Sequence, residues 1–157
     1  MTSYSFFTKA PLADPVYFKD VPVIFAYCDP AGIGFYPRLI EIINNTVEEW
    51  FEKLGFSFAR MHGKLAIGVP TVNLQVEFSK ACRLGEVLKV CLHIEELRKN
   101  RLSLRLRARC RGEMRWEAVA TLVCVRLNPL KSINWPNDLY EILHYENAKN
   151  SHLNPTF

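Results

Sequence analysis

The chain has 157 residues, of which 49% are hydrophobic and 23% are charged, and its formal net charge is +4. This length suits one domain over residues 1–157, with a core that we expect to span about residues 16–145. The mild charge suits anionic ligands but is too small to indicate nucleic acid, and no apolar run approaches the roughly 20 residues that a membrane-spanning helix needs.

The cysteines and the N-terminus indicate the compartment. Five scattered cysteines without a Cys-x-x-Cys pair argue against a disulfide framework and against a zinc site. The first residues lack the basic region and the apolar stretch of a secretory signal. We therefore expect a cytoplasmic protein that holds no metal.

The sequence of the first third of the chain predicts an arm, a strand, a turn and a helix, in that order. Residues 1–15 have no clear period and are expected to lie on the surface. Residues 17–25 read as a strand, which Pro22 marks as an edge strand or a bulged one. Residues 28–34 are rich in turn-forming residues. A long amphipathic helix follows, with apolar residues at Leu39, Ile43, Val47, Trp50 and Leu54.

The helix limits and the later elements follow from turn signals and alternation. Pro37 suits the first helical turn and Gly55 the C-terminal cap, after which residues 56–68 are expected to form a loop. Glycines and polar residues then separate strands that are predicted over residues 71–78, 87–95, 101–111 and 117–127. The last of these is apolar on both faces, which favours a central position. A short helix is predicted over residues 137–143, before a frayed polar end over residues 146–157.

Arginines alternate with apolar residues in the third of these strands. They are Arg105, Arg107, Arg109 and Arg111. Such a ladder fits a solvated outer face of the sheet, or a face that meets acidic residues of another subunit.

This order of elements predicts an α+β fold. A single long helix with one wide apolar face has only the antiparallel sheet to pack against. A sheet curled around one central helix is the hotdog architecture, and the chain shows no repeat or domain boundary.

The turn before the helix carries a resemblance to a known family. The run Cys28-Asp29-Pro30-Ala31-Gly32-Ile33, followed by Phe35-Tyr36-Pro37 and a long helix, resembles the signature of the 4-hydroxybenzoyl-CoA thioesterase family. The similarity extends over about residues 17–127, but its specific part is residues 28–37. The resemblance implies an acyl-CoA substrate, Asp29 as the catalytic carboxylate and the Tyr36 main-chain N–H as the group that binds the thioester carbonyl oxygen.

The chemistry is consistent with this assignment. A helix N-terminus offers free N–H groups to a developing oxyanion, and Asp29 either attacks the thioester carbon or deprotonates a water. Coenzyme A leaves as a thiolate, so one carboxylate suffices and no cofactor is expected beyond the coenzyme A of substrate and product. The alternative is that Asp29 only caps the turn. Cys28 lacks a local base and is interpreted as structural. His62 is a candidate for substrate contact, but a weaker candidate for a functional role than Asp29.

Other contacts are also predicted from the resemblance. The residues expected to contact substrate are Gly32, Ile33, Phe35 and Thr71, and those expected to bind the coenzyme A phosphates are Arg98, Lys99, Asn100 and Arg101. Basic residues in an exposed turn also serve solubility, so this second role is open. Because hotdog proteins pair their sheets, we expect a homo-oligomer, either a dimer or a dimer of dimers, with the site at the subunit boundary.

The chain departs from the family at several positions. Tyr27 stands where a second acid is expected, Gly34 replaces a β-branched residue and Arg38 replaces an asparagine. Asn44 stands where the hydroxybenzoyl-specific enzyme has an acid, which argues against hydroxybenzoyl specificity and leaves an aromatic or a short-to-medium acyl group.

Two other functions remain open from the sequence. A hotdog protein that binds acyl-CoA or acyl-carrier protein without hydrolysis would share the same features. A hotdog dehydratase would need a well-placed histidine, and none lies between Asp29 and the end of the predicted helix.

Overall fold

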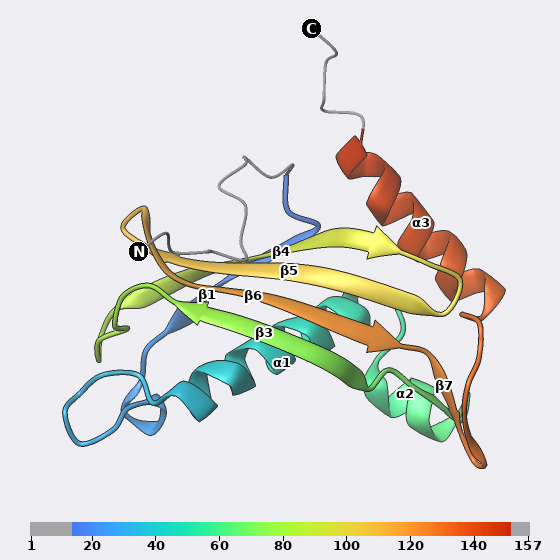
Figure 1. The fold of residues 1–157 in the computed structure, drawn as a ribbon, viewed down its shortest axis with the longest axis horizontal. Helices are drawn as coiled ribbons and strands as arrows, with labels where there is room; N and C mark the ends of the chain where they lie inside the picture. The colour runs from blue at the N-terminus through green and yellow to red at the C-terminus, as the bar shows by residue number, and fades with distance from the viewer. Residues whose placement is uncertain (1–13, 152–157) are drawn as a thin grey trace, which may run out of the picture.

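The computed structural model describes residues 14–151, which form two antiparallel sheets and three α-helices (Figure 1). The strands are β1 (Tyr17–Pro22), β2 (Ile67–Gly68), β3 (Thr71–Phe78), β4 (Val87–Leu97), β5 (Arg101–Cys110), β6 (Glu113–Val123), β7 (Val125–Leu127) and β8 (Leu130–Ser132). The helices are α1 (Tyr36–Lys53), α2 (Phe58–Gly63) and α3 (Asn137–Ser151), with one 3-10 turn at Phe25–Tyr27. The predicted arm lies almost entirely outside the described residues.

The main sheet has five strands in the order β1-β4-β5-β6-β3, and a small sheet has the order β2-β7-β8. Figure 1 shows α1 lying along one face of the main sheet, while α3 lies at the end where β4 leads into β5. The edge position predicted for the first strand is confirmed, and that strand ends at Pro22. The internal position predicted for the last long strand is confirmed for β6.

The long helix forms with the predicted limits. Pro37 is its second residue, where no N–H is needed, and Gly55 follows its end with a φ of +86°. Its apolar face packs on the inner face of the sheet, where side chains such as Leu92 and Leu104 are fully buried. Each such leucine contributes about 1.5–3 kcal/mol. Among residues 14–151, no helix has the length and hydropathy needed to cross a bilayer.

The predicted loop over residues 56–68 is wrong in part, because it contains α2 and β2. The Ser57 hydroxyl caps α2 by accepting from the Arg60 N–H (3.2 Å), and Met61 is fully buried beneath the helix. A helix of six residues is too short to show an apolar period in the sequence.

The predicted strand over residues 117–127 is also wrong in its limits. β6 begins at Glu113, directly after a turn in which Arg111 and Gly112 both have positive φ. It stops at Val123, and the next residue, Cys124, donates its N–H to the carbonyl of Asn100 (2.9 Å). The chain then continues as β7, which pairs with β2 and β8 in the small sheet.

The final helix is longer than predicted. α3 runs from Asn137 to Ser151, so the expectation of a short helix and of fraying after residue 146 is wrong for residues 146–151. Leu139 and Leu143 are fully buried and fix its first half on the core. The second half has little apolar periodicity, which is why the sequence did not predict it.

The arginine ladder is not a fully solvated face. Arg105 and Arg107 are largely buried, and both donate to Glu117 on β6 (2.6 and 2.9 Å). Arg105 also pairs with Glu95 on β4. Burial lowers the pKa of Arg105, but the hydrogen bonds to both carboxylates outweigh it and raise that pKa. The acidic partners of these two arginines therefore come from neighbouring strands of the same chain, whereas Arg109 and Arg111 are exposed.

A polar cluster joins the edge strand β1 to α1. Tyr17 donates to Glu49 Oε2 (2.9 Å) and Lys19 donates to Glu49 Oε1 (2.7 Å). Burial and the hydrogen bond to Glu49 raise the pKa of Tyr17 to about 12. Burial raises the pKa of Glu49, but the hydrogen bonds from Lys19 and Tyr17 bring it below its ordinary value.

Candidate active site

The predicted catalytic carboxylate lies in a tight hairpin before α1. An antiparallel bridge joins Cys28 to Gly34, and the Asp29 N–H donates to the carbonyl of Ile33 (3.0 Å). Inside the turn, the Ala31 N–H donates to Asp29 Oδ1 (2.8 Å). No hydrogen bond from residues 14–151 reaches the other oxygen, Oδ2. The half-buried carboxylate is therefore held through one oxygen while the second stays available.

The helix α1 begins with an unused main-chain donor. Phe35 precedes the helix in an extended conformation and gives no side-chain cap. The N–H groups of Arg38 and Leu39 both donate to the Phe35 carbonyl (2.9 and 3.2 Å), and Pro37 has no N–H. Within the described residues, the N–H of Tyr36 has no acceptor. At the positive end of the helix dipole, this N–H suits a negatively charged or polarised oxygen.

A hollow of about 220 Å³ opens beside this helix end. Tyr36 contributes to its wall from α1, Ile33 and Gly34 from the hairpin, and Phe78 from the end of β3. Asp29 belongs to the same hairpin but is not one of the residues that line the hollow. The free N–H and the carboxylate thus belong to one short segment at the edge of an open space.

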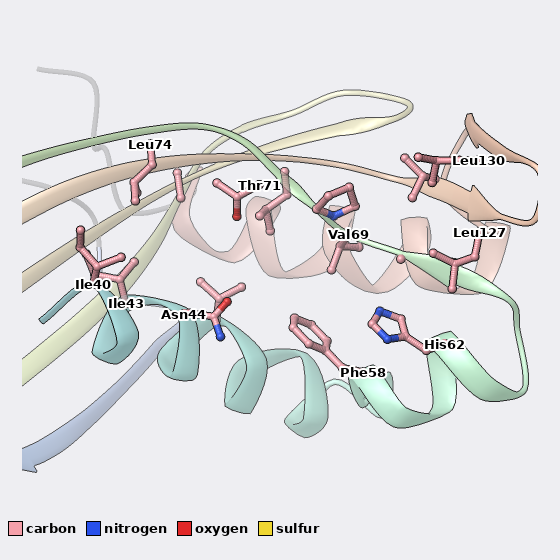
Figure 2. Close-up of a pocket in the computed structure, with 16 residues that line it drawn as sticks. Ile40, Ile43, Asn44, Phe58, His62, Val69, Thr71, Leu74, Leu127 and Leu130 are labelled. Carbon is pink, nitrogen blue, oxygen red and sulfur yellow. The ribbon is translucent and has the colours of Figure 1, made fainter. Parts of the chain in front are cut away.

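A larger cleft of about 550 Å³ lies further along α1, between this helix, β3 and α2 (Figure 2). Its walls are mainly apolar and include Ile40, Ile43, Val47, Leu74, Leu122, Leu127 and Leu130. Among residues 14–151, no aspartate, glutamate, lysine or arginine lines it. Its polar side chains are those of Asn44, His62 and Thr71 (Figure 2). The cleft therefore suits an uncharged, largely apolar group.

Thr71, which was predicted to contact substrate, lines this cleft because β3 is bulged. Thr71 pairs with Leu122 and Asn73 with Thr121, so Val72 is the extra residue between the two pairs. The bulge turns Thr71 onto the inner face of the sheet, where Leu122 is buried. Thr71 is nevertheless about 24 Å along β3 from the end of the strand at the hollow.

The basic turn predicted to bind coenzyme A lies at the opposite end of the sheet from Asp29. β4 begins beside the hairpin, where the Leu84 N–H donates to the Gly32 carbonyl (3.0 Å), and it ends directly before residues 98–101. Its eleven residues span about 34 Å. The turn itself is tied to the α3 end of the sheet, since the Lys99 carbonyl accepts from the Trp135 N–H (2.8 Å). Within one chain, Arg98, Lys99, Asn100 and Arg101 do not meet Asp29.

Of the other predicted contact residues, Ile33 lines the hollow, whereas Gly32 and Phe35 line neither the hollow nor the cleft. Gly32 has a φ of +75°, a conformation that favours glycine. A Cβ on Gly34 would lie 3.0 Å from Leu39 Cδ2, so its missing side chain allows the hairpin to approach α1. The ring of Phe35 packs edge-on against that of Tyr36 (5.7 Å) and lines neither the hollow nor the cleft.

The sequence did not place α2 at the cleft. Phe58 and His62 project from this helix into the space below Val69 and Thr71 (Figure 2). Leu130, in the small sheet, closes the same end of the cleft. Phe58 and His62 are four residues apart, and Ser57 before them is a capping residue. This spacing and this cap were the signals in the sequence for a helix with both rings on one side.

The chain matches the sequence model of the thioesterase superfamily over residues 44–117. This match confirms the resemblance to thioesterases that the motif at Asp29 indicates. It begins downstream of residues 28–37, the specific part of that resemblance. No curated protein matches the chain in sequence.

Several solved structures share the fold. A DHNA-CoA thioesterase from Staphylococcus aureus is 22% identical, with a TM-score of 0.79 and coverage of 88% of this chain and 95% of its own. A hypothetical protein from the same organism, in complex with CoA, is 18% identical, with a TM-score of 0.81 and coverage of 96% and 92%. A 1,4-dihydroxy-2-naphthoyl-CoA thioesterase from Synechocystis is 17% identical, with a TM-score of 0.75 and coverage of 87% and 98%. The predicted α+β hotdog fold is confirmed.

Proposed function

We propose that this chain is an acyl-CoA thioesterase that uses Asp29 and the N-terminus of α1 to hydrolyse the thioester of an aromatic or a short-to-medium acyl group. The observation that carries the proposal is the N–H of Tyr36, which has no acceptor among the described residues, in a residue that lines a hollow and follows the hairpin of Asp29 directly. Two of the similar structures are of CoA thioesterases and a third was solved with CoA, which supports the substrate class.

The proposed reaction begins with the thioester carbonyl accepting a hydrogen bond from the Tyr36 N–H. Asp29, through the oxygen that Ala31 does not engage, either takes a proton from an attacking water or attacks the carbonyl carbon itself. In both routes the tetrahedral oxyanion is stabilised at the helix end, and the carbon–sulfur bond breaks to release coenzyme A as a thiolate. A mixed anhydride formed by direct attack is then hydrolysed by water. No cofactor takes part in this reaction.

The acyl group is proposed to extend from the hollow into the larger cleft. Tyr36 lines the first space and Ile40, one helical turn further on, lines the second. On the opposite wall, Phe78 and Leu74 are four residues apart on the same face of β3. The direction from the carbonyl site is therefore along α1 and towards its C-terminal half.

We further propose that the protein is a homo-oligomer. β3 is an edge strand whose side chains are mostly exposed, including Val72 (54%) and Leu74 (37%), and it carries no lysine or arginine that would oppose pairing with another strand. A second copy offers one way for residues 98–101 to reach a coenzyme A bound at Asp29. The five free thiols support the proposed cytoplasmic location.

Thiol release from a panel of acyl-CoA esters tests the catalytic proposal. Asp29→Asn is the informative variant, because its amide oxygen keeps the acceptor for the Ala31 N–H while the carboxylate is lost. We expect kcat to fall by roughly 10²-fold or more. Asp20→Asn is the matched control, since Asp20 is an exposed carboxylate on β1 whose register partner, Lys89, lies on the face of the sheet away from α1.

The outcomes separate the two function classes. Hydrolysis that is undiminished in Asp29→Asn removes this residue from the mechanism. Tight binding of acyl-CoA by the wild type without any thiol release contradicts hydrolysis and supports a binding protein instead. For the oligomer, the mass is measured by sedimentation for the wild type and for Gln75→Lys, which places a charge near the middle of β3 to oppose pairing. A monomeric mass for the wild type contradicts the proposal.

A further inference from the structure

We infer that Arg115 is a positioning residue, whose guanidinium fixes a loop beside the hairpin of Asp29 and thereby holds the Asp29 carboxylate and the Tyr36 N–H in register with the substrate. The inference rests on the proposed function, because it takes these two groups as the ones that act on the thioester. It gives a role to a residue of β6 that lines neither the hollow nor the cleft.

One arm of the hairpin pairs with residues 81–86, which we call the support loop. The Gly34 N–H donates to the Cys82 carbonyl (2.7 Å). Two residues further on, the Leu84 N–H donates to the Gly32 carbonyl (3.0 Å). Within residues 14–151, no other main-chain hydrogen bond links residues 32–34 to the chain outside the hairpin. The position of this arm therefore depends on the position of the support loop.

The side chain of Arg115 holds the support loop at both ends. Its Nη1 donates to the carbonyl of Ala81, and its Nη1 and Nη2 each lie 3.0 Å from a carboxylate oxygen of Glu86. Glu86 Oε2 also accepts from the Arg83 N–H (2.8 Å), inside the loop. A bidentate contact between a guanidinium and a carboxylate fixes direction as well as distance. One side chain therefore fixes both the first and the last residue of the support loop.

The ion pair between Arg115 and Glu86 is buried. The Arg115 side chain is 8% exposed and the Glu86 side chain is 14% exposed. The hydrogen bonds from the Arg83 N–H and the Arg115 guanidinium hold the pKa of Glu86 below its ordinary value, against the effect of burial. Uncharged side chains can often replace such a pair without loss of stability, so the property to be tested is the geometry that the pair imposes.

Short connections lead from the support loop to both reacting groups. Gly34, which the support loop holds, forms an antiparallel bridge with Cys28, the residue before Asp29. In the other direction, Gly34 lies two residues before Tyr36, the first residue of α1. A displacement of the support loop would therefore be transmitted to the carboxylate and to the N–H together. A misplacement of about 1 Å in such groups can cost roughly 10²-fold in rate.

A double variant that removes both charges tests the inference without leaving a buried ion alone. Arg115→Met with Glu86→Gln removes the guanidinium and the carboxylate, while the glutamine oxygen keeps the acceptor for the Arg83 N–H. The exposed Glu113, 3.8 Å from Arg115 Nη2, keeps its pair with Lys80. We expect the urea unfolding midpoint to stay close to that of the wild type, while kcat for thiol release falls by about tenfold to 10²-fold and KM changes by less than about threefold.

Two further variants serve as controls. Lys19→Met with Glu49→Gln removes an ion pair of 2.7 Å between β1 and α1 that contacts neither the hairpin nor the support loop, and kcat is expected to stay within about threefold. Arg115→Lys keeps a positive charge beside Glu86 but cannot form the planar fork and bind Ala81 as well. Its kcat is expected to fall by about tenfold.

Hydrogen exchange of the Gly34 amide, followed by NMR, reports on the hairpin without requiring turnover. In the double variant at residues 86 and 115, this amide is expected to exchange about tenfold faster than in the wild type, because its acceptor at Cys82 is held less firmly. The amides of β5 are expected to exchange as in the wild type. Acceleration confined to the hairpin distinguishes lost positioning from a general loss of stability.

The results decide the inference separately from the catalytic proposal. Wild-type kcat in the double variant overturns it, and so does wild-type kcat in Arg115→Lys, because the charge alone would then suffice. A fall in kcat with unchanged exchange of Gly34 also overturns it, since the hairpin would not have been released. If the double variant does not fold, Arg115→Lys decides by the same two readouts. Faster exchange of Gly34 in the double variant of a protein whose wild type releases no thiol supports the positioning of the hairpin while contradicting hydrolysis.

Discussion

The main-chain N–H of Tyr36 can be removed almost by itself through the substitution Tyr36→Pro. Proline is well accepted at the first position of a helix, and the preceding residue must then be extended. Phe35 already has φ −78° and ψ 122°, which meets this requirement. The residue Tyr36 is 60% exposed, so loss of its ring removes little packing. The helix and the hairpin are expected to keep their structure.

The expected effect follows from the role of a single oxyanion donor. Within the described residues, Tyr36 carries the one N–H of the first helical turn that lacks an acceptor, since Arg38 and Leu39 donate to Phe35 and Pro37 has none. Loss of one such donor costs about 10²–10³ in kcat, or roughly 2.7–4 kcal/mol. Tyr36→Ala loses the same ring but keeps the N–H, and is expected to stay within about threefold of the wild type.

The assay is steady-state thiol release with the best acyl-CoA of the panel, together with the urea unfolding midpoint of each variant. Equal activity of the proline and alanine variants at Tyr36 would refute the assignment of this N–H to the carbonyl oxygen. If that shared activity were well below the wild-type activity, the loss would be assigned to the ring instead. A lowered unfolding midpoint in the proline variant alone would contradict the claim that the helix start accepts proline.

Three further predictions concern stability and reactivity. Glu117→Gln is expected to lower the free energy of unfolding in urea by about 3 kcal/mol, because it takes a carboxylate from the buried Arg105, whereas the exposed i,i+3 control Glu41→Gln is expected to cost a few tenths. In the folded state the pKa of Glu49 is below its ordinary value of 4.5. Its ion pair therefore stabilises the protein above pH 4.5, and this contribution is lost as the pH falls through the folded pKa. Glu49→Gln is expected to have a lower free energy of unfolding than the wild type at pH 7, and the difference is expected to vanish in acid. Burial raises the pKa of Cys82 to about 11, so mass spectrometry after thiol labelling at pH 8 should find it unmodified until urea unfolds the protein.

The main features of the fold were predictable because local and global signals agree in them. The apolar stripe that includes Leu39 and Val47 has enough turns to show its period, and Pro37 and Gly55 mark its limits. The strand β5 alternates along its ten residues, and β4 alternates from Leu88 as far as Glu95, before its bulge. The errors fall where elements are short or where long-range pairing sets the limit, as after Val123, where the chain leaves the main sheet and Val125 pairs with Gly68 in the small sheet.

The arginine ladder shows a second reason for error. Alternation places Arg105 and Arg107 on the outer face correctly, but it contains no information about what lies opposite them. Glu117 becomes their partner through the register of β5 and β6, which pairs Arg107 directly with Glu117. The difference between a solvated arginine and a buried one therefore depends on strand pairing and not on the local pattern.

Candidate residues in the hairpin and at the helix start were accessible to sequence reasoning, because the motif that carries them is contiguous. The cleft was not, because its walls come from α1, α2, β3, β6 and the small sheet. Its polar residue Thr71 reaches it only through the bulge at Val72, and His62 only through a helix of six residues. Neither feature has a period or a turn signal strong enough to be recognised in one sequence.

The helix α1 connects these two parts of the site in a way that makes their functions separable. Its core face is directed at the sheet, and the stripe of Tyr36, Ile40 and Asn44 lies beside that face, along the hollow and then the cleft. Because a helix is rigid over this length, a substitution at Asn44 leaves the N–H of Tyr36 in place. Changes at the far end of the stripe should therefore alter which acyl group binds without altering how the thioester is cleaved, and changes at Tyr36 should do the reverse. A kcat that fell equally for every acyl group on substitution of Asn44 would contradict this separation.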